Sequence, residues 1–414
     1  MVKQGYKQTE IGVIPEDWDV KNLIDLSDGG MQNGVFYEVS RKGSGVFFLN
    51  VGNLYETAPI TTRTLEKFDA TTNEIERFKV KHGDLFFTRS SIVPSGIAYC
   101  NWYKGENDET TVFDSHVVRF KTDTEQVVPM YLYLQCISHS SRKYFISNAK
   151  VATMTTIDQN QIGCCQIPVP TYDEQKCIAE ALSDVDSMIS SLEKLIAKKK
   201  AVKQGAMQEL LTGKKRLPGF TGEWAHMELG KYGSLMKETI NPQLYSSEYF
   251  GEYSMPAFDE GRTPIKQKGA DMHSNRTVIC GKVLLFNKLN VRQKRIWLID
   301  QCRDNAVCSS EFLPYKSDAI NLELLSQILY TDKVTLEFIG MSTGTSNSQK
   351  RITPDAFLEY KVYLPVNEKE QAAIANVFSC MDNEIEALEQ KLEKTRQIKQ
   401  GMMQQLLTGK IRLV

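Results

Sequence analysis

One long stretch occurs twice in this chain, and the repeat limits the folds that the chain can adopt. The first copy, EQKCIAEALSDVDSMISSLEKLIAKKKAVKQGAMQELLTGKKRL, starts at Glu174, and the second, EQAAIANVFSCMDNEIEALEQKLEKTRQIKQGMMQQLLTGKIRL, starts at Glu370. The copies align without a gap, and about half of their positions are identical. An amphipathic segment of this length cannot bury its apolar side chains alone. We therefore expect the two copies to cover each other.

Each copy predicts one long helix, because apolar residues recur at spacings of four and three, as in an a/d heptad pattern. These residues are Ile178, Leu182, Val185, Ile189, Leu192 and Ile196, and Ile374, Phe378, Met381, Ile385, Leu388 and Leu392. The pattern then shifts to Val202, Ala206 and Leu210, and to Ile398, Met402 and Leu406, so the packing should loosen in the last third.

The ends of both helices carry the same signals. Thr171 with Glu174, and Asn367 with Glu370, have the spacing of a capping box, and Gly213 and Gly409 suit left-handed C-terminal caps. A helix of roughly 40 residues would span on the order of 60 Å. We expect an antiparallel intramolecular coiled coil that relates the two halves of the chain by a pseudo-twofold axis.

The segments outside the repeats predict an α+β fold with two unlike domains. Alternating, aromatic and β-branched runs predict strands at 45–51, 84–88, 111–120, 276–286 and 295–299, and helices are expected at 127–138 and 322–330. We therefore divide the chain into a first domain at 1–170, a spacer helix at 171–217, a second domain at 218–366 and a C-terminal helix at 367–414.

Composition indicates a folded, multidomain protein, since 41% of the 414 residues are hydrophobic. No apolar run is long enough for a membrane span, and the first residues, MVKQGYKQTEIG, lack the apolar core of a signal peptide. We expect a cytoplasmic protein without a membrane partner. The nine cysteines form no CxxC motif, so we expect reduced and mostly buried thiols.

Catalytic signatures were sought, and none is convincing. The sequence has no [ND]PP[FY] motif for amino-methyl transfer and no GxxxxGK[ST] loop for ATP, and its five histidines lack metal-site spacing. Asp355, Glu359 and Lys361 mimic a metal-nuclease pattern, but their spacing is too short for carboxylates from separate strands. We expect no catalytic residues, metal or cofactor in this chain, and a metal nuclease is a remote alternative.

The order of several segments resembles the specificity subunit of type I restriction-modification systems. GYKQTEIGVIPEDWDV lies near the start, IPVPTYDEQ opens the first repeat, ELLTGKKRLPGFTGEW closes it, and a second LLTGK ends the chain. The resemblance covers the whole chain. It implies two target recognition domains, each reading one half of a bipartite double-stranded DNA sequence, and helices that fix their separation.

The resemblance also implies partners. Two modification (methyltransferase) subunits would bind the helices, and restriction/translocase subunits would join them in defence against foreign DNA. DNA methylation would fall on adenine, with S-adenosylmethionine, ATP and Mg²⁺ bound by the partner subunits. This chain would be the non-catalytic subunit of that methyltransferase/endonuclease.

Charge adds a complication, because the net charge is only -1 and the first domain has a small acidic excess. A protein that binds DNA alone usually carries a basic field. We infer that loops of this chain read bases, while much of the phosphate contact comes from partner subunits.

Candidate DNA-binding residues are basic, amide and hydroxyl side chains in loops, because arginine and lysine pair with guanine, and asparagine and glutamine with adenine. In the first domain they are Arg41, Lys42, Arg89, Ser90, Ser91, Lys150, Thr153, Thr155 and Thr156. In the second domain they are Asn287, Lys288, Arg292, Lys294, Arg295, Ser346, Asn347, Ser348, Gln349, Lys350 and Arg351. Each one could equally be a solvated surface residue.

Candidate partner-binding residues recur in both copies after the heptad pattern shifts. They are Lys203, Gln204, Met207 and Gln208, and Lys399, Gln400, Met403 and Gln404. Their duplication favours binding the same partner twice, although inherited helix packing would also preserve them. From the residues alone, a coiled-coil protein-interaction scaffold without DNA specificity remains the alternative.

Overall fold

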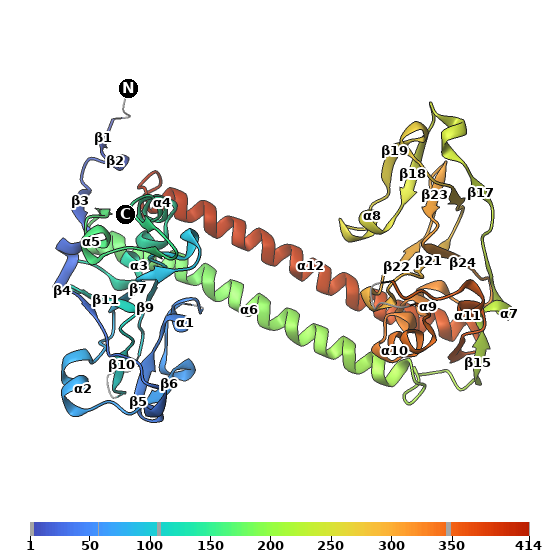
Figure 1. Ribbon diagram of the computed structural model, residues 1–414, viewed down its shortest axis with the longest axis horizontal. Helices are drawn as coiled ribbons and strands as arrows, with labels where there is room; N and C mark the ends of the chain where they lie inside the picture. Colours follow the sequence, from blue (N-terminus) through green and yellow to red (C-terminus); the bar gives the residue numbers. More distant parts are fainter. Residues whose placement is uncertain (1–3, 57, 106–108, 345–348, 414) are drawn as a thin grey trace. The chain divides into compact units, whose positions relative to one another are not determined.

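The computed structural model describes residues 4–56, 58–105, 109–344 and 349–413 (Figure 1). Contacts between residues divide the chain into two compact units. Unit 1 comprises residues 1–193 and 391–414, and unit 2 comprises residues 194–390. Each long helix therefore contributes one part to each unit, and the division into four consecutive domains stays a prediction.

The two long helices are present as predicted. They are α6 (Tyr172–Leu210) and α12 (Glu368–Leu406), each of 39 residues, and they pack together (Figure 1). Equivalent ion pairs join them in both units, at 2.6 Å between Lys399 and Asp186 in unit 1 and at 2.6 Å between Lys203 and Asp382 in unit 2. Within the described ranges, no helix has the length and apolarity needed to cross a membrane.

The helix ends confirm the predicted polar N-caps and glycine C-caps. Thr171 Oγ1 accepts a hydrogen bond from the Glu174 main-chain N–H at 3.4 Å, and Asn367 Oδ1 accepts one from the N–H of Lys369 at 2.9 Å. At the other ends Gly213 (φ 69°) and Gly409 (φ 67°) adopt the left-handed conformation that glycine favours.

The heptad pattern is confirmed where it is regular, and the packing loosens after the pattern shifts, as predicted. Ile178, Leu182 and Leu192 are buried, whereas Val202 and Ile398 are 50% and 49% exposed. The neighbouring lysines, Lys203 and Lys399, turn inward instead. Their ammonium groups pair with aspartates of the other helix, and their side chains are only 19% and 21% exposed.

Unit 1 is built on a four-stranded antiparallel sheet in the order β4–β11–β7–β9. These strands are β4 (Ser27–Asn33), β11 (Val117–Thr122), β7 (Leu85–Thr88) and β9 (Cys100–Trp102). A second sheet has the order β10–β5–β6, in which β10 is parallel to β5; its strands are β10 (Thr111–Phe113), β5 (Lys42–Leu49) and β6 (Glu66–Phe68). The strand predicted at 111–120 is therefore interrupted, because the chain leaves one sheet at Phe113 and enters the other at Val117.

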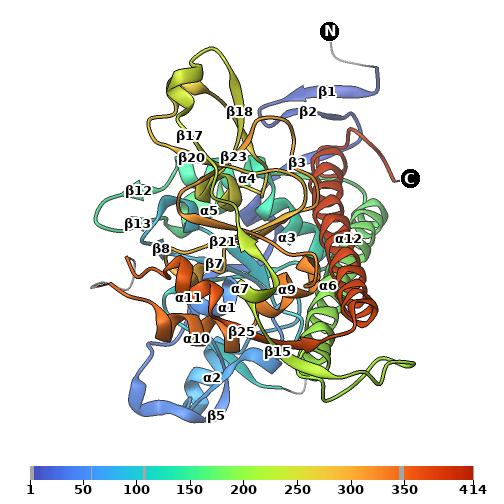
Figure 2. The same ribbon diagram turned by 90° about the vertical axis from the view of Figure 1, so that its right-hand side faces the viewer.

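Smaller elements complete unit 1. β14 (Gln166–Val169) pairs with β3 (Asp19–Asn22), and β1 (Tyr6–Thr9) pairs with β2 (Gly12–Pro15). Its helices include α1 (Val51–Leu54), α2 (Thr72–Phe78), α3 (Pro129–Ile137), α4 (His139–Ser147) and α5 (Gln159–Gly163). Figure 2 shows the β1–β2 hairpin beside the C-terminal end of α12, where the Tyr6 hydroxyl donates to the carbonyl oxygen of Gly409 at 3.0 Å.

Unit 2 repeats this plan with a different sequence. Its four-stranded sheet has the equivalent order β16–β24–β21–β22, formed by β16 (Ser234–Leu235), β24 (Phe312–Lys316), β21 (Val283–Asn287) and β22 (Ile296–Ile299). In its second sheet β18 (Tyr249–Tyr253) pairs in parallel with β23 (Ala306–Ser309) and antiparallel with β19 (Ile265–Lys268), and β17 (Thr239–Ile240) and β20 (Arg276–Val278) extend it. The strand predicted at 276–286 divides into β20 and β21 around Gly281 (φ 63°).

The remaining elements of unit 2 also match their counterparts. β15 (Trp224–Glu228) pairs with β25 (Lys361–Pro365), as β3 pairs with β14 in unit 1. The helices are α7 (Leu229–Tyr232), α8 (Met255–Asp259), α9 (Leu322–Leu329), α10 (Asp332–Met341) and α11 (Pro354–Leu358). The predicted α+β fold is therefore confirmed, and the two domains, although unlike in sequence, share one plan.

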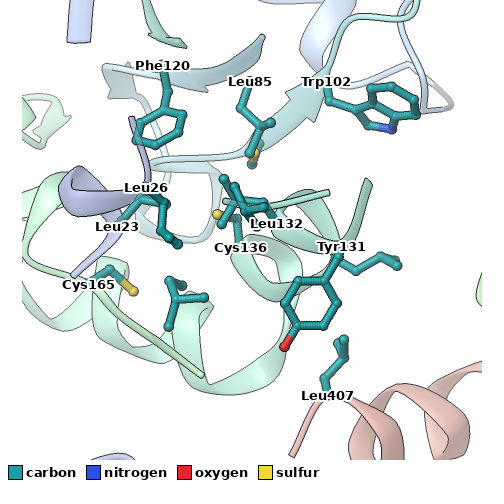
Figure 3. Packing of buried hydrophobic residues seen from close by; sticks show 14 of the residues in the cluster. Leu23, Leu26, Leu85, Trp102, Phe120, Tyr131, Leu132, Cys136, Cys165 and Leu407 are labelled. Atoms are coloured by element: carbon teal, nitrogen blue, oxygen red, sulfur yellow. The ribbon is translucent and has the colours of Figure 1, made fainter. Parts of the chain in front are cut away.

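The ends of the long helices belong to the cores of the units. In unit 1, Leu407 lies beside Tyr131, and Leu132, Leu85 and Phe120 belong to the same core (Figure 3). In unit 2 the core similarly includes Leu210 of α6 and Phe378 of α12. Each recognition domain predicted from the sequence is thus packed on both helices.

A buried glutamate joins each unit to the segment that follows a long helix. In unit 1 the Arg412 guanidinium binds Glu174 at 2.6 and 2.8 Å and Asp17 at 2.9 and 2.8 Å, and the Trp18 indole donates to Glu174 at 3.0 Å. The Asp17 pKa is lowered mainly by its hydrogen bond to Arg412. We call this set arginine junction 1.

Arginine junction 2 is the same arrangement in unit 2. Arg216 binds Glu370 at 2.6 and 2.6 Å, and the Trp224 indole donates to Glu370 at 3.3 Å. Both glutamates are 0% exposed. Glu174 and Glu370 therefore bind arginine and tryptophan, and the prediction that they complete capping boxes is wrong.

The cysteines are all free, and the prediction that most are buried is wrong. Cys100, Cys136, Cys165 and Cys308 are buried, whereas Cys164, Cys177, Cys280 and Cys380 are exposed and Cys302 is half-buried. The exposed thiols include Cys177 and Cys380, which lie on the outer faces of the long helices.

Candidate functional site

Three short segments of unit 1 join into a ladder that collects most of the first set of predicted residues. β13 (Thr155–Thr156) lies between β12 (Lys150–Val151) and β8 (Ser90–Ser91) and pairs antiparallel with both. We call this structure ladder 1. Segments that are about 60 residues apart in the sequence thereby become neighbours, which sequence reasoning alone did not establish.

Ladder 1 continues from the C-terminal end of β7 in the main sheet. The Arg89 main-chain N–H donates to the His116 carbonyl oxygen at 3.4 Å, and the Arg89 carbonyl oxygen accepts from the Ile157 N–H at 3.2 Å. The Arg89 and Thr153 side chains are exposed, and Lys150 is exposed with its ammonium group 3.6 Å from Asp158.

Other predicted residues of ladder 1 face less solvent. Ser90 and Ser91 are half-buried, and Ser91 Oγ accepts a hydrogen bond from the Val93 N–H at 3.3 Å. Thr156 is exposed, whereas Thr155 is buried. Thr155 therefore supports the ladder more readily than it could contact a ligand.

Unit 2 forms a corresponding structure, which we call ladder 2. It follows β21, the strand of unit 2 that is equivalent to β7. Leu289 and Thr343 both form antiparallel bridges with Arg351. Main-chain hydrogen bonds join Asn290 N–H to the Lys350 carbonyl oxygen at 2.9 Å and Ile352 N–H to the Lys288 carbonyl oxygen at 3.0 Å. The predicted residues Ser346, Asn347 and Ser348 lie outside the described part of the chain.

Several cations around ladder 2 are paired with carboxylates. Arg295 binds Asp259 at 2.8 and 2.7 Å, Arg351 binds Glu311 at 3.3 and 3.2 Å, and Lys294 pairs with Asp332 and donates to the Tyr330 carbonyl oxygen at 3.0 Å. The pKa of Asp259 is lowered mainly by the hydrogen bond from Arg295, and that of Asp332 by the hydrogen bond from Lys294. A DNA contact by these cations would therefore compete with an ion pair.

The remaining predicted residues of ladder 2 differ in exposure. Arg292 and Gln349 are exposed, and Lys288 and Lys350 are half-buried. Asn287 is buried; its Nδ2 donates to the Glu311 carbonyl oxygen at 3.2 Å, while its Oδ1 has no hydrogen-bond partner within the described ranges. This asparagine lies beneath the surface that a large ligand could reach.

Arg41 and Lys42 are not brought to ladder 1. They lie at the start of β5 in the second sheet of unit 1, where Lys42 Nζ is 2.9 Å from Glu66 and Arg41 forms a bidentate pair with Glu74. The hydrogen bond from Arg41 lowers the Glu74 pKa to about 2. Arg41 also lies over the Phe68 ring at 4.5 Å, so two neighbours restrain its guanidinium.

The residues predicted to bind partner subunits divide between inner and outer faces of the helices. Lys203 and Lys399 form the ion pairs with Asp382 and Asp186, and Met207 and Met403 pack against the cores of their units. Only the glutamines of this set are exposed: Gln204 and Gln208 on α6, and Gln400 and Gln404 on α12.

The metal-nuclease alternative gains no support from the geometry. Asp355 lies in the first turn of α11, and Glu359 caps the C-terminal end of the same short helix, so the carboxylates do not come from separate strands. Among the residues that the structure describes, no group of three or more histidine, cysteine, aspartate or glutamate side chains could hold a metal ion.

Sequence reasoning missed the apolar side chains of ladder 1, Ile92, Val93, Val151 and Met154, which are exposed. It considered only basic, amide and hydroxyl residues, and a β-branched residue in a strand is ordinarily assigned to the core. The two related units thus carry ladders that are lined by different side chains, and both units pack on the same long helices.

Comparisons with known proteins identify this class more closely. Residues 15–204 match the type I restriction modification DNA specificity domain. The chain is 25% identical to a protein of Methanocaldococcus jannaschii provisionally named the type I restriction enzyme MjaX specificity subunit, over 99% of this chain and 97% of that protein. It is 23% identical to the MjaVIII specificity subunit of the same organism, over 73% of this chain and 75% of that protein.

Solved structures share the fold. The S subunit of a type I restriction-modification system from M. genitalium aligns with 94% of this chain and 96% of its own, with a TM-score of 0.59 and 13% sequence identity. A chain from a structural study of assembly and conformational transition of the type I R-M system aligns with 96% of this chain and 99% of its own, with a TM-score of 0.54 and 12% identity. Residues 15–204 of this chain therefore match a type I restriction modification DNA specificity domain, and over 99% of its length the chain is similar to a type I restriction enzyme specificity subunit.

Proposed function

We propose that this chain is a specificity subunit of a type I restriction-modification system and reads a bipartite DNA sequence, with one unit for each half-site. The proposal rests on one observation: the two units share one fold, but different side chains line their ladders. Both units place a three-segment ladder after the equivalent strand of an equivalent sheet, but ladder 1 carries Arg89 and Lys150, and ladder 2 carries Lys288, Arg292 and Lys350. Side chains of these types recognise base edges or phosphates.

In this proposal the long helices set the gap between the half-sites. A helix of 39 residues is about 58 Å long at 1.5 Å per residue, compared with roughly 34 to 36 Å for one turn of DNA. Changing the helix length would move one unit along the duplex and around it. Helix length and surface identity are therefore separate determinants of the target.

We further propose that each copy of the repeat binds one modification subunit. Many residues that are identical between the copies have a role within the chain, since they form the arginine junctions, the lysine–aspartate pairs or parts of the cores. Gln204, Gly205 and Gln208, and their counterparts Gln400, Gly401 and Gln404, are identical but exposed. Binding the same partner twice explains why these residues are shared.

The repeated glycines support this surface. Gly205 and Gly401 lie inside long helices, where glycine costs about 1 kcal/mol relative to alanine. A Cβ atom added at either position would meet nothing within 4 Å, so packing within the chain does not require glycine. A helix of another subunit could instead approach the backbone closely at these points.

An apolar groove of about 420 Å³ adjoins Gly401 in unit 1. It is lined by Ile398, Met402, Leu406, Ile411 and Leu413, together with Ala181, Gln405 and Gly401. Such a surface fits the apolar face of an amphipathic helix. The corresponding residues on α6 include Val202 and Ala206, so the two partner sites would be related without being identical.

The subunit would carry no cofactor of its own in this scheme. Modification subunits would supply S-adenosylmethionine and transfer a methyl group to adenine, and restriction/translocase subunits would use ATP and Mg²⁺ for defence against foreign DNA in the cytoplasm. Phosphate contacts from these partners would account for the net charge of only -1 on this chain.

The proposal is tested by methylome sequencing of a host that expresses this chain with its modification subunit, compared with a host that lacks this chain. We expect a new split motif with modified adenine in both halves. Exchanging residues 1–170 for those of another specificity subunit should change one half-site only, and lengthening both helices by two turns should change only the gap. An assembled complex that produces no new methylation would favour the coiled-coil scaffold without DNA specificity.

A further inference from the structure

Four large apolar side chains are exposed on or beside ladder 1. Ile92 and Val93 follow β8, Val151 lies on β12, and Met154 lies between β12 and β13. Their exposed fractions are 84%, 55%, 70% and 45%. Single exposed apolar residues are ordinary, but a group on neighbouring segments marks an interaction surface.

The ladder places this group next to positive charge. Val151 pairs with Thr155, which pairs with Ser91 on the other side, so the apolar residues of β12 and those after β8 lie on either side of one short strand. Arg89 precedes β8, and Lys150 precedes Val151 with its side chain 73% exposed. Cations flanking an apolar group complement a polyanion that also presents apolar groups.

Duplex DNA has these properties in its major groove. The groove is about 12 Å wide and admits a two-stranded β-ribbon, and the thymine C5-methyl is the apolar group that base pairs present there. β12 and β13 form an antiparallel hairpin at one edge of ladder 1, with the exposed Thr153 and Met154 between them. Arg89 and Lys150 could then bind guanine edges or phosphates beside the apolar contacts.

We propose that unit 1 recognises thymine methyl groups through the apolar side chains of ladder 1, chiefly Ile92 and Val151. The inference rests on the proposed DNA-recognition function and deepens it by naming a specificity-determining contact. The half-site of unit 1 therefore contains thymine at one or more positions where the methyl group itself is read.

Ladder 2 gives the contrast within the same chain. Its half-buried Leu289 occupies the place of Ser91, and the exposed residues around it include Arg292, Gln293 and Gln349. These side chains would discriminate base pairs by hydrogen bonds. Loss of thymine methyl groups should therefore affect the half-site of unit 1 more than that of unit 2.

The test uses the assembled methyltransferase and its own motif, obtained by methylome sequencing. The half-site of unit 1 is the one that changes when residues 1–170 are exchanged. Duplexes are then made with deoxyuridine in place of each thymine of either half-site in turn, which removes the methyl group and keeps the base-pairing edge. We expect binding and methylation to fall about fourfold or more at one or more positions in the first half-site, because a buried methyl-sized group contributes about 0.8 kcal/mol.

Variants connect that loss to the ladder. Ile92→Ala and Val151→Thr should bind thymine and deoxyuridine duplexes with nearly equal affinity. Leu244→Ala removes a comparably exposed apolar side chain from unit 2 and should leave the thymine preference in the first half-site unchanged. Circular dichroism and the yield of assembled complex show whether each variant is folded.

Three results would overturn the inference. A methylated motif whose first half-site lacks thymine, or tolerates deoxyuridine throughout, would leave the proposed function standing without methyl recognition. Variants that lose the modification subunit while retaining the thymine preference would assign the apolar group to protein binding. An assembled complex that methylates no motif would refute the proposed function together with this inference.

Discussion

Replacing Gly205 or Gly401 with alanine should stabilise the subunit while weakening its binding to the modification subunit. Both glycines are exposed inside 39-residue helices, and an added Cβ would meet nothing within 4 Å. Alanine is favoured over glycine in a helix interior by about 1 kcal/mol, so each substitution should raise the free energy of unfolding by about that amount. The double variant should gain about 2 kcal/mol, because the two sites belong to different units.

The opposite effect is expected on assembly. A methyl group placed where a partner helix approaches the backbone forces that helix outward, and overpacking of this kind costs about 1–3 kcal/mol. We expect roughly a fivefold to hundredfold weaker affinity at the substituted site. Isothermal titration of the modification subunit should show one normal and one weakened site for each single variant, while urea unfolding reports the stability.

Gly340→Ala is a matched control. Gly340 is also an exposed helical glycine whose added Cβ would meet nothing within 4 Å, but it lies in α10, outside the repeats. This substitution should favour the helix without affecting assembly. If Gly205→Ala and Gly401→Ala stabilise the chain and bind the modification subunit normally, the glycines were merely inherited through the duplication, and the argument for a close partner contact is refuted.

Three further predictions concern the junctions, a buried acid and salt. Arg412→Ala should destabilise unit 1 by about 3 kcal/mol, and Arg216→Ala should destabilise unit 2 by about the same amount, because each change leaves a buried glutamate without its cation. Hydrogen exchange that increases equally in both units of either variant would contradict this. Burial raises the pKa of Asp84 to about 6, so the folded state binds a proton more tightly than the unfolded state. The free energy of unfolding should therefore fall by roughly 3 kcal/mol at most as pH rises from about 4 to 6. In Asp84→Asn this contribution should vanish, and an unaltered pH profile would exclude Asp84 as its source. DNA binding by the full assembly should depend more steeply on salt concentration than binding by this chain alone, and equal slopes would refute the view that partners supply most phosphate contacts.

The long helices could be predicted from the sequence because their information is local. Heptad spacing, polar N-caps and terminal glycines all lie within one segment, and their repetition at Glu174 and Glu370 excludes coincidence. The same local reasoning failed for these two glutamates. Their spacing from Thr171 and Asn367 matches a capping box, but the cations they bind, Arg412 and Arg216, lie far away in the sequence.

The candidate site shows the same division between local and distant information. The sequence identified the loops after β7 and β21 and those before the long helices, because basic and hydroxyl residues gather there. It could not show that Ser91 pairs with Thr155, or that Arg295 is bound by Asp259, since these contacts depend on the folded path of the chain. Nor could it show the exposure of Ile92, because an isolated isoleucine carries no signal of which side of a sheet it occupies.

Arginine junction 1 has a consequence for biosynthesis. Most residues of unit 1 are made before those of unit 2, yet Glu174 and Asp17 bind Arg412, which is made 238 residues after Glu174 and 395 residues after Asp17. Unit 2 obtains its equivalent arginine, Arg216, before most of its own residues have been made. Unit 1 therefore begins to be made first but is completed second, and its buried Glu174 has no cation until unit 2 and then Arg412 have been made. A stop codon in place of Arg412 would leave every residue of unit 2 in the chain and damage unit 1, most of which precedes unit 2 in the sequence.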